Sequence, residues 1–288
     1  MEAGGGVMAH SRPVAGGAMP SVKKVVIAGS AYVIAFIFLF PYLVMLLTAL
    51  RPQSSLREAE YFPSSFEWSN LLNFWTGGLA DNLLVTLKVA AGSTLLVLLV
   101  ALPAAYYSAR HNFRGRTAFL ILVLITQMFQ PTAMLVGIYR EFYQFGLVDS
   151  TWSLILVNGG FNLAFAVWIL NAYFASIPRE LEEAAFMDGN GRFGALFRIT
   201  LPLAMPGVIT ALIFTFIAAW NEFVVALTLT TSPENQPLTV ALNSFIGQYS
   251  VDWQNLFAGS VIATLPVIIL FALIERKVVG GLTAGSIK

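Results

Sequence analysis

The amino-acid sequence predicts an all-α membrane protein that crosses the bilayer six times. Of its 288 residues, 57% are hydrophobic and only 11% are charged, whereas soluble domains are about 25% charged. Six apolar runs are each long enough to cross a bilayer as a helix, which takes about 20 residues. The polar segments between them carry far more basic residues on one predicted side of the membrane than on the other.

The six predicted spans are separated by loops of unequal length. They are residues 25–50, 83–107, 117–139, 152–174, 205–229 and 256–274. The first run exceeds the apolar core of a signal peptide, which is about 7–15 residues long, so we expect it to remain as a membrane helix. We expect residues 1–22, rich in Gly, Ala, Pro and Ser, to form a disordered tail. Residues 23–279 then form the membrane domain, and residues 280–288 form a second tail.

The distribution of basic residues predicts the orientation. Six spans place both termini on one side, and the loops on that side carry most of the lysines and arginines. These are Arg12, Lys23, Lys24, Arg110, Arg114, Arg116, Arg179, Arg192, Arg198, Arg276, Lys277 and Lys288. The other side has only Arg51, Arg57 and Arg140, and Lys88 lies near the end of a span. Because cytoplasmic loops are enriched in Lys and Arg, we expect both termini to be cytoplasmic.

The composition excludes several classes of function. The chain has no cysteine and only two histidines, His10 and His111, neither of which lies in a predicted span. We therefore expect no metal site and no catalytic residue. The net charge of +1 gives no reason to expect a nucleic-acid partner. No lysine follows a glycine, which excludes a phosphate-binding loop, so any ATP and Mg²⁺ that drive this protein bind to a separate subunit.

The polar loop at residues 176–206, between the fourth and fifth spans, is expected to be ordered. Pro178 suits the first turn of a helix, and Ser176 or Ile177 is in place to cap it. The helix dipole favours acidic residues in that turn, which holds Glu180, Glu182 and Glu183. Gly189 is a suitable left-handed stop, and a second short amphipathic segment follows it. Two short helices at a membrane surface, one with an Ala-Ala face, would form a docking surface for another protein.

This loop also carries a recognisable pattern. It runs Glu183-Ala184-Ala185, three residues, Gly189, nine residues, Ile199, one residue and Leu201-Pro202. This spacing resembles the EAA loop of ABC importer permeases. Asn190, where sugar-type members usually have Ala, is a small departure. In that family the loop forms a coupling helix that inserts into a cleft on the ATP-binding subunit. The resemblance implies ATPase docking by Glu182, Glu183, Ala184, Ala185, Met187, Asp188 and Gly189.

The resemblance covers nearly the whole chain after residue 22. Three features carry it: the six-span layout, the stretch Trp220-Asn221-Glu222-Phe223 and the ending Gly281-Leu282-Thr283-Ala284-Gly285. Together they look like the smaller permease of maltose-type carbohydrate importers. That likeness implies a type I ABC importer transmembrane fold in a bacterial plasma (inner) membrane. It implies a heterodimer with a second permease, two ATP-binding subunits and an extracytoplasmic solute-binding protein, which residues 230–255 would approach. It further implies that the tail reaches the ATPase through Thr283, Ala284, Gly285 and Lys288.

Polar residues in or near the predicted spans are candidates for a solute path. They are Gln127, Asn158, Asn162, Trp220, Asn221, Glu222 and Asn243. Amide side chains could hydrogen-bond a polyhydroxylated solute, and an indole could stack on a sugar face. An acid within a span is by default a functional candidate. The alternative stays open for each amide, because Asn and Gln also join membrane helices to one another, at about 1 kcal/mol each or less.

Two other classes of function compete with an importer subunit. An ion-coupled secondary carrier would show inverted repeats and broken helices, and no repeat is visible in the sequence. An intramembrane enzyme would need a nucleophile and base, or a metal pair such as H-E-x-x-H. The positions of the two histidines argue against this class.

Overall fold

The computed structural model describes residues 22–52, 55 and 65–284, and in this part of the chain the regular structure is helical apart from an isolated antiparallel bridge between Ile246 and Val251. The longer helices are α1 (Val22–Ala49), α2 (Ser69–Thr76), α3 (Leu79–Arg110), α4 (Arg116–Thr126), α5 (Pro131–Gln144), α6 (Thr151–Ser176), α7 (Glu180–Met187), α10 (Met205–Trp220) and α13 (Trp253–Ala284). The shorter ones are α8 (Arg192–Ala195), the π-helix η2 (Leu196–Thr200), α9 (Leu201–Leu203), α11 (Val224–Leu229), the 3-10 helix η3 (Pro233–Asn235) and α12 (Leu238–Asn243).

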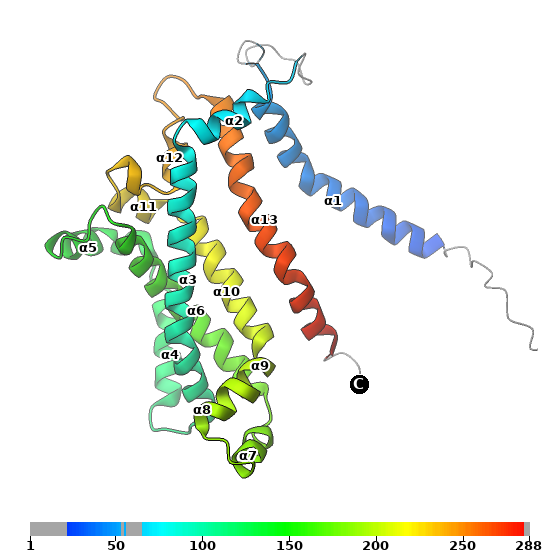
Figure 1. Ribbon diagram of the computed structural model, residues 1–288, viewed down its shortest axis with the longest axis vertical. Helices are drawn as coiled ribbons and strands as arrows, with labels where there is room; N and C mark the ends of the chain where they lie inside the picture. Colours follow the sequence, from blue (N-terminus) through cyan, green and yellow to red (C-terminus); the bar gives the residue numbers. More distant parts are fainter. Residues whose placement is uncertain (1–21, 53–54, 56–64, 285–288) are drawn as a thin grey trace, which may run out of the picture. The chain divides into compact units, whose positions relative to one another are not determined.

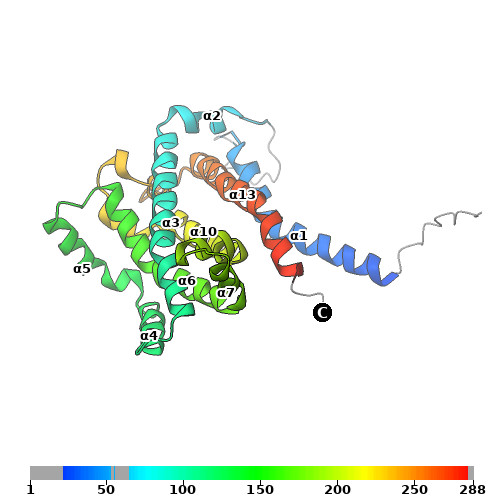
Figure 2. The ribbon, with the colours of Figure 1, turned by 60° about the horizontal axis from the view of Figure 1, so that its bottom comes forward.

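The chain divides into two units, residues 1–44 and 45–288. In the first unit, the described part is residues 22–44 of the apolar helix α1, whose large side chains are exposed from Val25 to Val44. In the second, α3 runs along the bundle, with α2 and α12 at one end and α7 and α8 at the other (Figure 1). The end that carries α7 comes forward in Figure 2.

Among the described residues, four helices are long and apolar enough to cross a membrane without a break. They are Lys23–Ala49, Leu79–Arg110, Thr151–Ser176 and Trp253–Ile274. Two further pairs pass the same test only when their halves are taken together: Arg116–Thr126 with Pro131–Gln144, bent by 93°, and Arg192–Leu203 with Met205–Trp220, bent by 73°. Counting each bent pair as one span gives six, the number that the sequence predicts, although the second pair starts within the polar loop expected over 176–206.

Two predicted spans are not continuous helices. The prediction for residues 117–139 was wrong in this respect, because the chain leaves the helix between Thr126 and Pro131. Gln130 has an extended backbone, with ψ of 130°, as expected for a residue that precedes proline. The prediction for residues 205–229 was also wrong, since α10 ends at Trp220 and α11 starts only at Val224.

The sixth helix is longer than predicted. Instead of ending near Ile274, α13 continues through the charged residues to Ala284. Thr283 and Ala284, which we expected in a tail, therefore have helical backbone, whereas Gly285 and Lys288 lie outside the described residues. Residues 1–21 of the N-terminal tail predicted over 1–22 also lie outside them, and Val22 already belongs to α1. Within the loop over residues 230–255, the short helix α12 ends at Asn243.

Small residues allow close packing in the centre of the bundle. α3 and α6 pack most extensively, and α10 packs against both. Their shared core contains Ala101, Ala105, Ala166 and Ala211, each fully buried. Small residues at such contacts let helix backbones approach closely.

The contact between α10 and α6 depends on a glycine. A Cβ added at Gly207 would lie 2.4 Å from Cγ of Tyr173, whereas one added at Gly160 would meet nothing within 4 Å. Both substitutions replace a helical glycine with the residue of highest helix propensity. We therefore expect Gly207→Ala to lower the free energy of unfolding by about 1–3 kcal/mol through overpacking, and Gly160→Ala to leave it unchanged or raise it slightly. Thermal unfolding of the purified variants in detergent measures both; equal melting temperatures would contradict the close contact.

The two loops that follow α5 and α11 are joined by Asp149. Its backbone is left-handed, with φ of 60°, and its Oδ1 accepts hydrogen bonds from the backbone N–H groups of Thr231 (2.9 Å) and Ser232 (3.0 Å). The Ser232 hydroxyl donates to its Oδ2. Burial by itself raises the pKa of Asp149, but these hydrogen bonds outweigh that effect and lower the pKa to about 2. The carboxylate therefore remains ionised at neutral and mildly acidic pH.

Candidate functional site

The expected docking helix exists as α7, between α6 and the segment that leads into α10. Three acidic residues occupy its first turn, where the helix dipole favours them. Gly189 follows its end with φ of 81°, and the N–H of Asn190 donates to the carbonyl oxygen of Ala185. The predicted left-handed stop is thus confirmed.

The predicted N-terminal cap of α7 was wrong. α7 begins after Arg179, and no side chain caps it. The Ser176 hydroxyl instead donates to the carbonyl of Tyr173 within α6, at 2.8 Å. The carbonyl of Ile177 accepts a hydrogen bond from Nη1 of Arg110, at 2.9 Å. The turn between α6 and α7 is therefore held by an arginine from α3.

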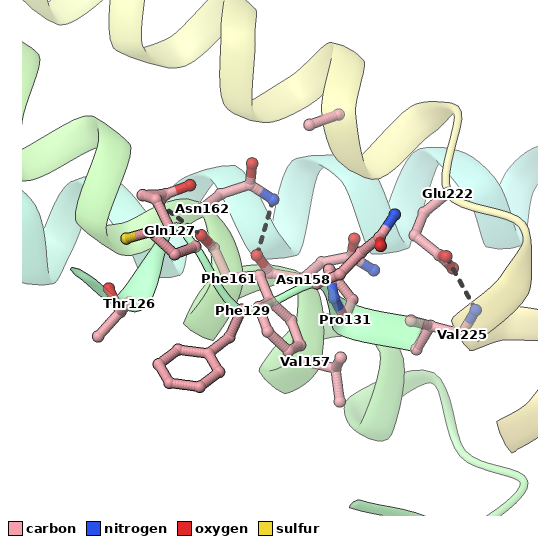
Figure 3. A pocket seen from close by; sticks show the side chains of 13 residues that line it. Thr126, Gln127, Phe129, Pro131, Val157, Asn158, Phe161, Asn162, Glu222 and Val225 are labelled. Carbon is pink, nitrogen blue, oxygen red and sulfur yellow. Dashed lines mark hydrogen bonds between the residues drawn. The ribbon is translucent and has the colours of Figure 1, made fainter. Parts of the chain in front are cut away.

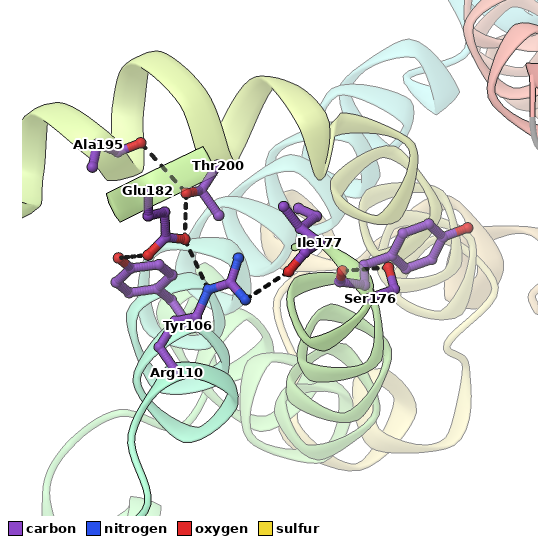
Figure 4. A network of polar contacts seen from close by, with 8 residues as sticks. Tyr106, Arg110, Ser176, Ile177, Glu182, Ala195 and Thr200 are labelled. Atoms are coloured by element: carbon purple, nitrogen blue, oxygen red, sulfur yellow. Dashed lines mark hydrogen bonds and ion pairs between the residues drawn. The ribbon is translucent and has the colours of Figure 1, made fainter. Parts of the chain in front are cut away.

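Glu182 points into the protein and not toward a partner (Figure 4). Its Oε1 accepts from Nε of Arg110 (2.8 Å) and from the hydroxyl of Thr200 (2.6 Å), and its Oε2 accepts from the Tyr106 hydroxyl (3.1 Å). The side chains of Arg110 and Glu182 are only 6% and 9% exposed. The expectation that Glu182 belongs to the docking surface was wrong, because its carboxylate is buried and accepts hydrogen bonds from Arg110, Thr200 and Tyr106.

Ala185 is also buried, at 2% exposure, so it packs inside the chain and does not offer the small outer face that we expected. The remaining residues of α7 leave a free surface. We define the coupling surface as five exposed residues of α7 and its C-terminal cap, Leu181, Glu183, Ala184, Met187 and Asp188. Met187 is 89% exposed and Leu181 42%. The surface therefore offers apolar side chains flanked by two carboxylates.

A polar cavity lies where both interrupted helices face α6 (Figure 3). It has a volume of about 470 Å³, and its wall comes from the break between α4 and α5, the middle of α6 and the break between α10 and α11. Of the candidate residues, the structure brings four to this wall: Gln127, Asn158, Asn162 and Glu222. Two aromatic residues that the sequence did not predict, Phe129 and Phe161, also line it.

The amides in the cavity are oriented by the backbone of α6. The side-chain nitrogen of Gln127 donates to the carbonyl oxygen of Phe161 (3.1 Å). That of Asn158 donates to the carbonyl oxygen of Leu154 (2.9 Å), and that of Asn162 to the carbonyl oxygen of Asn158 (2.8 Å). Because a carbonyl oxygen can only accept, this fixes which end of each amide is the donor. Within the described part of the chain, the amide oxygens accept no hydrogen bond, so each is free to accept one from a hydroxyl group.

The carboxylate of Glu222 is hydrogen-bonded to two backbone N–H groups. Its two carboxylate oxygens accept from the backbone N–H groups of Val225 (2.8 Å) and Ala226 (2.9 Å). These N–H groups belong to the first turn of α11, which has no partner for them within the helix. Glu222 therefore stabilises the restart of the helix after the break and adds a negative charge to the cavity wall.

Three other candidates do not line this cavity. Trp220 is only 4% exposed and stacks on Phe216 at 5.5 Å between ring centroids, so it is not placed to stack on a sugar. Asn221 donates to the carbonyl of Ile217, and Asn243 lies on α12. Among the residues that the structure describes, no cluster of His, Cys, Asp or Glu could hold a metal ion.

A helical membrane bundle with a polar cavity between its spans and an exposed helix at one end has the arrangement of a permease subunit. Residues 98–279 match the family described as the binding-protein-dependent transport system inner membrane component, and the chain belongs to this family. It is a multi-pass membrane protein whose relatives include permeases of carbohydrate ABC transporters.

Two relatives illustrate this. The chain is 35% identical over 253 residues to the sulfoquinovosyl glycerol transport system permease protein SmoH of Agrobacterium fabrum, with 87% of this chain and 89% of that protein covered. It is 31% identical over 253 residues to the trehalose transport system permease protein SugB of Mycobacterium tuberculosis, with 87% and 92% covered.

The fold matches a solved structure. A chain from the crystal structure of a bacterial ABC transporter involved in the import of the acidic polysaccharide alginate superimposes with a TM-score of 0.74, at 22% identity, with 88% of this chain and 96% of that chain covered. At this identity the likeness supports the fold alone. The predicted class, an all-α ABC importer permease, is confirmed.

Proposed function

We propose that this chain is one of two permease subunits of a carbohydrate importer and that a separate ATPase drives it by alternating access. The observation that carries the proposal is the coupling surface: an exposed apolar and acidic patch on a helix that is itself fixed rigidly to the membrane bundle. Such a helix can transmit the closure of an ATPase dimer to the spans, so that ATP binding favours one of two packings.

The orientation and the partners follow from the same proposal. Lys and Arg residues cluster at the end of the second unit that carries α7, and under the positive-inside rule this supports a cytoplasmic position for that end. ATP and Mg²⁺ would bind to two ATPase subunits there. A solute-binding protein would meet the opposite end, where residues 230–255 lie. A second permease would complete the solute path.

The cavity suits a neutral, hydroxylated solute better than an anion. Its described lining residues include no Lys, Arg or His, and they present free amide oxygens next to the Glu222 carboxylate. A sugar hydroxyl can donate to each amide oxygen, whereas an acidic sugar would be repelled by the carboxylate. Trehalose and diacetylchitobiose, named for two relatives, are therefore the first solutes to test.

The test is uptake into proteoliposomes that contain this chain and the subunits that co-purify with it. We expect ATP-dependent uptake of one neutral disaccharide, and Asn158→Leu and Asn162→Leu to reduce it about tenfold by removing hydrogen bonds to the solute. Asn221→Leu, an exposed amide that does not line the cavity, is the matched control. Uptake without ATP would support the ion-coupled secondary carrier instead, and equal uptake by all variants would contradict the role of the cavity.

A further inference from the structure

A second cavity, at the end of the bundle that carries α7, is lined by three arginines from separate segments. Arg110 is the last residue of α3, Arg116 is the first residue of α4, and Arg179 follows α6. Together with Ser176, Ile177 and Glu180 they line a cavity of about 480 Å³. Residues far apart in the sequence thus bring positive charge to one place, between the ends of two membrane-spanning helices.

Two guanidinium groups in this cavity have donors without acceptors. Arg110 uses Nε for Glu182 and Nη1 for the carbonyl of Ile177 (Figure 4). Its Nη2, and Nε of Arg116, are buried and have no hydrogen-bond partner in the described part of the chain. An unpaired buried donor is costly, and it is rare enough to need an explanation. An anionic oxygen in the cavity would supply the missing acceptor.

The charge balance identifies the kind of anion. Glu182 neutralises Arg110 at 2.8 Å, and Glu180 is the only carboxylate among the described residues that line the cavity. One positive charge therefore remains in excess, which suits a monoanion. A guanidinium group matches a phosphate well because it donates two parallel hydrogen bonds. A phosphodiester carries one negative charge and offers two unesterified oxygens.

The position of the cavity identifies the source of that phosphodiester. It lies at the ends of apolar spans, where lipid headgroups are found. Tyr107, which is three residues before Arg110 and therefore on the same side of α3, is 53% exposed and stacks on His111. Exposed aromatic residues are typical of the membrane–water interface, and basic pockets between membrane helices bind anionic lipid headgroups. We propose that Arg110, Arg116 and Arg179 bind the phosphodiester of an anionic phospholipid.

The test measures lipid binding and does not depend on transport. The tagged chain is purified in mild detergent with its accompanying subunits, and the binding of phosphatidylglycerol is measured by native mass spectrometry, against phosphatidylcholine. Inorganic phosphate and glycerol phosphate serve as soluble competitors. The test variant is the double substitution Arg116→Gln and Arg179→Gln. Arg110 is left intact because it also anchors Glu182. Arg114→Gln, an exposed arginine in the same loop that does not line the cavity, is the matched control.

We expect the double variant to bind phosphatidylglycerol about tenfold more weakly than the wild-type protein, with an unchanged melting temperature, and Arg114→Gln to bind it normally. Phosphatidylcholine, which has no net charge, should bind more weakly to the wild type. An equal loss in Arg114→Gln would show that only the general surface charge matters and would overturn the site. Displacement of the lipid by inorganic phosphate at matched concentration would overturn the lipid as the ligand.

Discussion

Replacing Glu182 with alanine is expected to destabilise the protein by about 3–5 kcal/mol, because it leaves the buried guanidinium of Arg110 without its charge partner. The same change at the next residue, Glu183→Ala, removes an exposed carboxylate and should alter the free energy of unfolding by less than about 0.5 kcal/mol. Thermal unfolding of the two purified variants in detergent measures the difference. The pair is closely matched, since both residues lie in the first turn of α7.

A double-mutant cycle separates the ion pair from other effects at position 182. The cost of Arg110→Ala and that of Glu182→Ala should not add, because each removes the same contact, and the double variant should be more stable than their sum predicts. Glu182→Gln, which keeps an acceptor for Thr200 but loses the charge, should fall between the wild-type protein and Glu182→Ala. Additive losses would show that the two side chains contribute independently and would contradict the network.

Glu183→Lys is expected to leave the protein folded in the membrane while it removes most of the ATPase from the purified complex. The residue lies on the coupling surface, so reversal of its charge would place a lysine against any basic residue of the partner, and like charges across an interface cost several kcal/mol. We expect the recovery of the ATPase subunit with the tagged chain to fall at least about tenfold. Quantitative mass spectrometry of the purified complex measures this recovery.

The control for this substitution is Glu141→Lys, the same charge reversal at an exposed position on α5. It should leave ATPase recovery unchanged. If Glu183→Lys retains the full amount of ATPase and full ATP-dependent uptake, the coupling surface does not contain residue 183. If both variants lose the ATPase equally, the loss follows from the net charge and not from the position.

The sequence predicted the position of α7 and the glycine that follows it, because those features depend on local rules for helix ends. It did not predict that Glu182 and Glu183 face opposite ways. That difference depends on Arg110, which lies 72 residues earlier in the chain, and the charge pattern of one loop holds no information about so distant a partner. The break before Pro131 could have been found from the Gln130-Pro131 pair, since the residue before proline avoids helical backbone.

The cavity was predicted in part. Its amides stood out because polar residues are rare in membrane spans. The prediction that Trp220 lines the solute path was wrong because α10 is apolar on all sides, so its sequence does not indicate which face meets the core. Asp149 was missed because a single aspartate in a polar loop is unremarkable until the partner loop, at residues 229–235, is known.

The hydrogen bonds of Glu182 also restrict how α7 can move. A loop that joins two spans by its ends alone could swing about those two points and absorb a displacement. Here the carboxylate adds a third attachment point on α3, through Arg110 and Tyr106, and a fourth on η2, through Thr200. A body fixed at points that do not lie on one line cannot rotate independently. While these bonds hold, α7, the C-terminal end of α3 and the start of the segment leading to α10 must therefore shift as a single rigid body.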